Sequence, residues 1–240
     1  MDQPQPQPRR HIGTFHKTGT ALFESILLAA QKSGLLIPWF LHDGPAPAHW
    51  DVVFDYQSKT LVRSFDRDPA TSRYVICIRD PRDLIVSAAY YHCNANEAWL
   101  RLPDQRFGGM TYQDKINSFP TMTDRFLFEM EYSSYWQIQE MLQVPFDAPS
   151  FHVTQLEKLV ADHELWEFHR IFTFLKYDIE TVLDLMKIAL KHSLFHGRIK
   201  PSVHVRSGKP AQYLTEFDAR ALSRYEQVFG DAAVKLGYPA

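Results

Sequence analysis

Residues 16–20, HKTGT, separate two segments of different pattern. The short run Arg10–Phe15 precedes them, and Ala21–Lys32 follows with apolar residues at helical spacing. We therefore predict a strand, a tight loop and a buried helix. Such a unit directs several backbone N–H groups and the positive end of the helix dipole to one point, where phosphate or sulfate binds.

The loop itself carries side chains that suit an anion. Lys17 supplies a mobile positive charge, and Thr18 and Thr20 supply hydroxyl donors. The Walker A spacing is missing, because no glycine stands five residues before the His16-Lys17 pair. In the alternative interpretation, Gly19 only tightens a turn and Thr18 caps the helix; this tetrapeptide alone does not decide between the two.

Several further segments have the composition of strands or the period of helices. Short runs rich in Val, Ile and aromatic residues predict parallel strands at Val52–Tyr56, Thr60–Phe65, Tyr74–Ile78 and Phe151–Gln155. A period of 3.6 predicts helices at 127–141, 168–175 and 182–189. We expect a final helix at 218–236, closed by Gly237. Asp178 has the position and side chain of an N-cap.

This alternation of strands and helices predicts an α/β fold. We expect a single domain at residues 10–240, with a central, mainly parallel sheet flanked by helices. Residues 1–9 are expected to form a disordered tail rich in Gln and Pro. The segment 192–213 has two glycines, two prolines and no period, and we expect a long functional loop there.

Composition excludes several classes of protein. The net charge of −2 lacks the basic excess of a nucleic-acid binder. The two cysteines, Cys77 and Cys93, form no CxxC pair, so we expect neither a disulfide framework nor a zinc site. The apolar stretches are too short to span a bilayer, and the first residues lack a signal peptide's apolar region. We expect a cytoplasmic protein without a metal.

A second polar cluster follows the predicted strand Tyr74–Ile78. Arg79 stands at the carboxyl end of that strand, where open α/β sheets bind ligands. Pro81 suits the first turn of a helix, and Ser87 follows two turns later. Surface charge pairing is the alternative for residues 79–83. We expect that alternative for Arg82, but not for Arg79.

Both clusters, with residues 203–209 (VHVRSGK), resemble the signature of the sulfotransferases that use 3′-phosphoadenosine 5′-phosphosulfate (PAPS), and Phe151–Leu175 resembles the region between them. The resemblance implies a P-loop-like α/β sulfotransferase fold. It also implies direct in-line transfer of a sulfuryl group from PAPS to a hydroxyl or amine of a small-molecule acceptor, leaving adenosine 3′,5′-bisphosphate (PAP).

The same resemblance implies roles for residues of the site. Lys17 would stabilise the charge that develops on the leaving phosphate, and Thr18, Gly19 and Thr20 would hold the 5′-phosphosulfate. The residues implied at the 3′-phosphate are Arg79, Ser87, Arg206, Ser207 and Gly208.

Two departures from the animal cytosolic branch stand out. Ala21 and Leu22 occupy the positions of its second Thr and its adenine-stacking Trp, and Phe65 occupies the position of its catalytic His. A general base must then come from elsewhere. Asp66 and His16 are our first candidates, ahead of the weaker Glu157 and His42.

Two other functions stay open at this stage. A P-loop-type kinase would use ATP with Mg²⁺ and would leave Arg79, Ser87 and Arg206 without a role. A non-catalytic nucleotide-binding protein with the same fold would explain the absent His and Trp, but not the presence of Lys17. The sequence sets neither the acceptor nor the oligomeric state.

Overall fold

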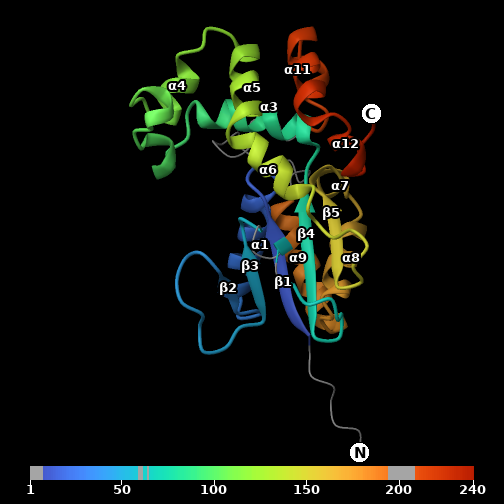
Figure 1. Cartoon of the computed structure of the whole chain (residues 1–240). Coiled ribbons are helices and arrows are strands. Elements are labelled where there is room, and N and C mark those ends of the chain that lie inside the picture. The colour runs from blue at the N-terminus through green and yellow to red at the C-terminus, as the bar shows by residue number, and fades with distance from the viewer. Residues whose placement is uncertain (1–7, 59–61, 64, 194–208) are drawn as a thin grey trace, which may run out of the picture. The chain divides into compact units, whose positions relative to one another are not determined.

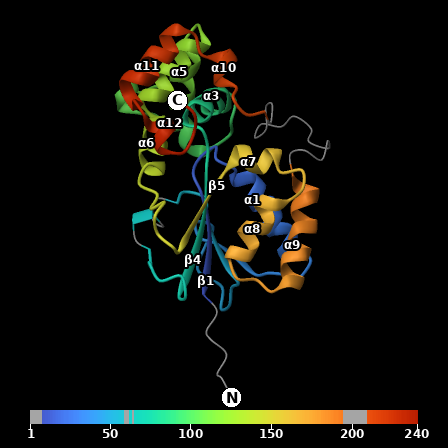
Figure 2. The same ribbon diagram turned by 90° about the vertical axis from the view of Figure 1, so that its right-hand side faces the viewer.

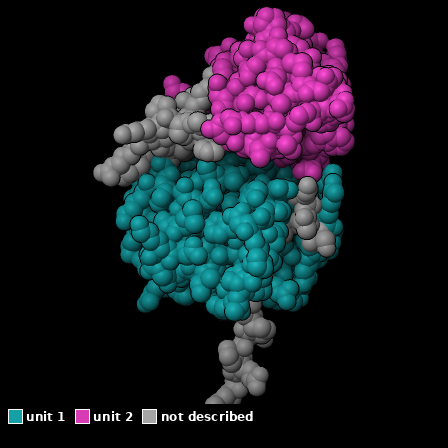
Figure 3. Space-filling model, turned by 90° about the vertical axis from the view of Figure 1, so that its left-hand side faces the viewer, with its two compact units in different colours: residues 1–78, 143–198 teal, residues 79–142, 199–240 magenta. Residues whose placement is uncertain are grey.

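The computed structural model describes residues 8–58, 62–63, 65–193 and 209–240. The chain forms two compact units, shown in two colours in Figure 3. Unit 1 comprises Met1–Ile78 and Gln143–Arg198, and unit 2 comprises Arg79–Leu142 and Ile199–Ala240.

Unit 1 is built on a five-stranded sheet with the order β2-β3-β1-β4-β5 (Figure 1). The strands are β1 (Arg9–Thr14), β2 (Pro38–Phe40), β3 (Val52–Asp55), β4 (Ser72–Ile78) and β5 (Phe151–Gln155). All neighbouring strands are parallel, with Gly13 paired to Asp55 and Thr14 to Cys77. The carboxyl ends of β3, β1 and β4 therefore meet at one edge of the sheet. The predicted α/β fold with a mainly parallel sheet is confirmed.

Helices of unit 1 cover one face of this sheet. They are α1 (Thr20–Lys32), α7 (Leu156–Ala161), α8 (Trp166–Phe174) and α9 (Ile179–His192). Figure 2 shows α1, α8 and α9 on the same side of the strands. Between them lies a core to which the sheet contributes Ile12, Phe54 and Val75, and α1 contributes Phe23 and Ile26. Burial of each large side chain contributes about 1.5–3 kcal/mol, which holds α1 and the preceding loop against the sheet.

The opposite face of the sheet carries an aromatic ladder. Side chains alternate along a strand, so His11 and Tyr74 point away from Ile12 and Val75. The rings of His11 and Tyr74 stack at 4.6 Å, and those of Tyr74 and Phe151 at 4.8 Å. Burial and the charge of Arg9 lower the pKa of His11 to about 4.

Unit 2 is helical in its described residues. Its elements are α3 (Pro81–His92), η1 (Ala98–Arg101), η2 (Gln105–Phe107), α4 (Tyr112–Asn117), α5 (Met122–Glu131), α6 (Ser133–Met141), α10 (Tyr213–Glu216), α11 (Ala219–Phe229) and α12 (Ala232–Lys235). The fully buried carboxylate of Glu129 joins three of them. It pairs with His92 Nδ1 at 2.6 Å and accepts from the hydroxyls of Tyr112 and Ser134 at 2.9 Å each. A buried charge is tolerated when its hydrogen-bond capacity is satisfied in this way.

Some predicted elements differ from the observed ones. The predicted helix at 127–141 is broken at Tyr132, whose ψ of −100° separates α5 from α6. The one at 218–236 is broken at Gly230 (φ 53°). Val62 and Arg63 are helical, so the strand predicted at Thr60–Phe65 is wrong there. Asp178 caps α9 as predicted, accepting from the Thr181 N–H at 2.8 Å.

The described residues include neither a membrane-spanning helix nor a cluster of metal-binding side chains. None of their helices has the length and apolar character needed to cross a membrane. They also contain no group of three or more His, Cys, Asp or Glu side chains arranged to hold a metal ion.

Candidate active site

The loop between β1 and α1 lies at the carboxyl edge of the sheet and turns through left-handed backbone. Lys17 has φ 66° and Gly19, the N-cap of α1, has φ 114°. A Cβ on Gly19 would lie 3.2 Å from Leu156 Cδ1 and 3.4 Å from Cys77 Sγ. Glycine is therefore required there both by conformation and by space. His16 and Lys17 are partly exposed.

The hydroxyls of Thr18 and Thr20 hold this loop in place. Thr18 is fully buried, and its hydroxyl accepts from the Phe15 N–H at 2.8 Å and lies 2.9 Å from the carbonyl oxygen of Cys77 in β4. The hydroxyls of Thr14 and Thr20 lie 2.8 Å apart and join the end of β1 to the start of α1. In this structure both hydroxyls bond within the protein, and Thr18 in particular supports the loop from inside.

The start of α1 has the donors that an anion needs. The backbone N–H groups of Gly19, Thr20 and Ala21 make no hydrogen bond to another described residue. The first N–H groups of a helix have no partner within the helix and carry the positive end of its dipole. The arrangement can hold a phosphate or sulfate group at the backbone, with Lys17 in the same loop.

In unit 2, two residues separate α3 from the end of β4, and Asp80 is the N-cap of α3. The Asp80 side chain accepts from the Arg82 N–H at 2.9 Å, and Pro81 occupies the first turn as predicted. The expectation of a surface charge pair at Arg82 is wrong. Its side chain is only 7% exposed, and it also donates to the carbonyl of Pro239 at 2.8 Å. A contact with the C-terminal end of the chain buries it.

Two of the predicted 3′-phosphate residues lie in the described part of unit 2, and they differ in exposure. Arg79, just before the Asp80 cap, is 9% exposed, and Ser87 in α3 is partly exposed among buried neighbours. Burial raises the pKa of the Asp83 carboxyl, while the N–H of Tyr213 and the charge of Arg79 act against that rise. Arg206, Ser207 and Gly208 lie outside the described residues.

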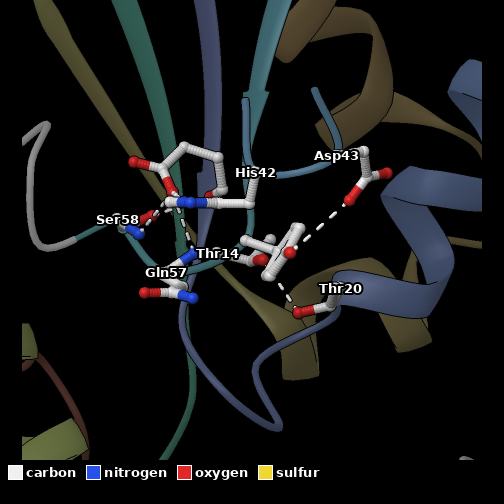
Figure 4. A network of polar contacts seen from close by, with 8 residues as sticks. Thr14, Thr20, His42, Asp43, Gln57 and Ser58 are labelled. Carbon is white, nitrogen blue, oxygen red and sulfur yellow. Dashed lines mark hydrogen bonds and ion pairs between the residues drawn. The ribbon is translucent and has the colours of Figure 1, made fainter. Parts of the chain in front are cut away.

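A histidine–aspartate pair stands at the same edge of the sheet in unit 1. His42 follows β2, and its Nε2 lies 2.7 Å from Oδ1 of Asp55, the last residue of β3. Asp55 is fully buried and also accepts from the N–H groups of Gln57 and Ser58, at 2.9 and 3.0 Å. Figure 4 shows His42, Gln57 and Ser58, which all contact Asp55, together with the Thr14–Thr20 contact. Sequence patterns favoured Asp66 and His16 over His42 and did not single out Asp55, because only strand pairing brings His42 and Asp55 together.

Comparison with known proteins agrees with this architecture. A family model described as "Sulfotransferase domain" matches residues 58–231, which is more than half of the chain. The chain belongs to this sulfotransferase family. The match begins after the Lys17 loop, so the family model does not cover this loop. The evidence for the roles of its residues is the geometry described above.

Solved structures with low sequence identity share the fold of this chain. Mouse sulfotransferase SULT7A1 complexed with PAP matches with a TM-score of 0.60 and 12% identity, over 97% of this chain and 89% of that one. Retinol dehydratase with androsterone and inactive cofactor PAP gives 0.55 and 14%, over 94% and 82%. The same enzyme with retinol and PAP gives 0.55 and 13%, over 95% and 82%. No curated protein sequence matches the chain.

The structure does not bring Asp66, our first candidate base, to the Lys17 loop. Asp66 accepts from the Thr71 hydroxyl, which precedes β4, and its N–H donates to Tyr74 near the start of that strand. These bonds place Asp66 at the amino edge of the parallel sheet, opposite the Lys17 loop. The Thr71 hydroxyl lowers the pKa of Asp66. This position argues against Asp66 as the general base.

Phe65 has a packing role at the same end of unit 1. Its ring packs edge-on against Phe151 at 4.7 Å and Tyr74 at 6.3 Å. Tyr74 and Phe151 lie near the amino ends of β4 and β5, so Phe65 lies opposite the Lys17 loop. This position argues against the alignment of Phe65 with a catalytic histidine. Leu22, where the animal branch has Trp, is 8% exposed and belongs to the core.

Proposed function

We propose that this protein transfers a sulfuryl group from PAPS to a hydroxyl or amine of a small-molecule acceptor by direct in-line transfer. One observation carries the proposal. In a chain of the sulfotransferase family, the first N–H groups of α1 have no acceptor in the described residues, and they share a loop with Lys17. This combination suits an anhydride of phosphate and sulfate, whose negative charge grows on the phosphate as the sulfuryl group leaves.

The two sequence clusters have different roles in this proposal. The N–H groups of Gly19 and Thr20 bind the 5′-phosphosulfate, Lys17 stabilises the leaving phosphate, and buried Thr18 keeps the loop in shape. Arg79 and Ser87 bind the 3′-phosphate, together with Arg206, Ser207 and Gly208. Arginine suits this task because its planar guanidinium can donate two parallel hydrogen bonds to phosphate oxygens.

The comparisons support an apolar alcohol as the acceptor. Retinol dehydratase was crystallised with androsterone and with retinol. Both ligands are largely apolar and carry a hydroxyl. We propose that the acceptor belongs to this class. We also propose that the protein acts in the cytoplasm, with PAPS as its donor.

Calorimetric titration tests the donor site. The protein with EDTA should bind PAP with micromolar affinity and should bind adenosine 5′-monophosphate, which lacks the 3′-phosphate, much more weakly. Arg79→Gln should reduce the ratio of the two affinities about tenfold or more, because a charged hydrogen bond to phosphate is worth about 1.5–3 kcal/mol. Lys17→Asn should weaken the binding of both ligands. Asparagine is suitable because it tolerates the left-handed backbone at this position.

Lys32→Asn is the matched control for Lys17, since Lys32 is exposed at the far end of α1. It should bind both nucleotides as the wild-type protein does. Preference for ATP with magnesium, or equal affinity for PAP and adenosine 5′-monophosphate, would contradict the proposed donor and favour the kinase interpretation.

A further inference from the structure

The pairing of three strands brings His42 and Asp55 to the edge that carries the Lys17 loop. β2, β3 and β1 are consecutive in the sheet, and Asp55 is in register with Gly13, one residue before the end of β1. The Leu41 N–H donates to Phe54 at 3.0 Å and continues the pairing beyond β2. His42 is the next residue, so this pairing places its ring beside the end of β3.

Asp55 is held in a fixed orientation. Its Oδ1 accepts from two backbone N–H groups as well as from His42, and Ser58 turns back with φ 46° to supply one of them. A non-glycine residue at this φ is uncommon and carries a conformational cost. The Ser58 hydroxyl also donates to the Asp55 carbonyl at 3.2 Å. The turn therefore fixes the carboxylate, and the carboxylate fixes the imidazole.

This contact selects one tautomer of His42. An ionised carboxylate only accepts hydrogen bonds, so Nε2, 2.7 Å from Asp55, must carry the proton. The lone pair of the neutral ring is then on Nδ1. Nδ1 makes no hydrogen bond to another described residue and is not among the buried polar atoms that lack a partner. The side chain of His42 is 25% exposed, so Nδ1 is open to solvent.

We infer that His42 is the general base of the proposed sulfuryl transfer and that Asp55 is its positioning residue. The inference rests on the proposed function. Nδ1 takes the proton of the acceptor hydroxyl as the acceptor oxygen forms its bond to sulfur. The bond from sulfur to the phosphate oxygen breaks, and its electron pair stays on the phosphate, near Lys17. The Asp55 charge stabilises the imidazolium that results, as in other His–carboxylate pairs.

The tautomer gives a readout that does not depend on turnover. A long-range proton–nitrogen correlation spectrum of the donor-free protein should show His42 protonated at Nε2, with His42→Gln identifying its signals. Asp55→Asn should lose this preference, because a carboxamide can offer the ring a donor as well as an acceptor. A His42 protonated at Nδ1 in the wild-type protein would overturn the inference.

Kinetics with 2-naphthol test the catalytic role. His42→Gln should lower kcat by about 100-fold or more, the usual range for general base catalysis, and leave PAP affinity within about twofold. The loss should be smaller with 4-nitrophenol at alkaline pH, where the acceptor is already ionised. His49→Gln is the control, because His49 lies in the same β2–β3 connection and its side chain is 75% exposed.

Two different failures can be told apart. A wild-type protein that does not bind PAP would remove the proposed function, whatever the tautomer of His42. Normal PAP binding with a kcat of His42→Gln within about threefold of wild type would overturn only the role of His42.

Discussion

The hydroxyl oxygen of Thr18 lies 2.9 Å from the carbonyl oxygen of Cys77, which joins the loop after β1 to the end of β4. The same hydroxyl accepts from the Phe15 N–H at 2.8 Å. Because Thr18 is fully buried, water does not compete for these hydrogen bonds. They fix the backbone whose N–H groups form the proposed anion site.

We expect Thr18→Val to lower the free energy of unfolding by about 1–3 kcal/mol, because it removes a buried hydroxyl and leaves the Phe15 N–H without its acceptor. Affinity for PAP should fall as well, since the loop loses its anchor. Chemical denaturation and calorimetry measure the two effects. Thr18→Ser keeps the hydroxyl and should recover most of both; a valine variant as stable as the wild type would show that the contact contributes little.

Gly19→Ala should destabilise the loop more than an equivalent change at another left-handed glycine. The added Cβ at Gly19 meets Leu156 and Cys77 at 3.2 and 3.4 Å, and φ is 114°. Gly34, with φ 74°, has nothing within 4 Å of an added Cβ. Gly34→Ala therefore measures the conformational cost alone, about 1 kcal/mol. Equal losses of stability and of PAP binding in the two variants would contradict the steric requirement at Gly19.

Local patterns predicted the elements that local interactions determine. The change of period after residues 16–20 marked the end of β1 and the start of α1, and Asp178 was identified as a cap from its own position. These features depend on residues within about one helical turn, so a single sequence contains them.

Long-range contacts determine what the sequence did not predict. His42 and Asp55 are 13 residues apart and meet only through the pairing of β2 with β3. Apolar composition predicted a strand at Thr60–Phe65, but Val62 and Arg63 are helical and Phe65 packs against Tyr74 and Phe151. Arg82 looked like a surface residue because its neighbours are charged, yet Pro239, 157 residues away, covers it.

Stability should fall with acidification through the ionisation of His11. Burial and the charge of Arg9 lower its pKa from 6.5 to about 4, so the unfolded chain binds this proton more readily. The contribution of the neutral ring is complete above pH 6.5 and is lost as the pH falls towards 4. His11→Phe keeps an aromatic ring against Tyr74 but cannot ionise.

Denaturation over this pH range should give a flatter profile for His11→Phe than for the wild type. The difference should be on the order of 1 to 3 kcal/mol at the acid end. His49→Gln, at an exposed histidine, should retain the wild-type slope. Parallel profiles for wild type and His11→Phe would show that other groups cause the acid sensitivity.

Two Asp–Arg pairs with the same local geometry allow the effect of burial to be measured directly. Asp80 and Asp104 each accept from the N–H two residues ahead, and from the guanidinium of Arg82 or Arg106. The Arg82 side chain is 7% exposed and that of Arg106 is 63% exposed. Arg82 also lies 4.0 Å from the ring centroid of Tyr213 and donates to Pro239.

We expect Arg82→Ala to lower the free energy of unfolding by about 3 kcal/mol, because it removes the guanidinium that pairs with the buried Asp80 carboxylate. Arg106→Ala should lower it much less, since water replaces an exposed partner. Urea denaturation of both variants measures the contrast, and raised salt should weaken only the Arg106 pair. Comparable losses would mean that Arg82 contributes no more than an ordinary surface pair, despite its contact with the C-terminal end of the chain.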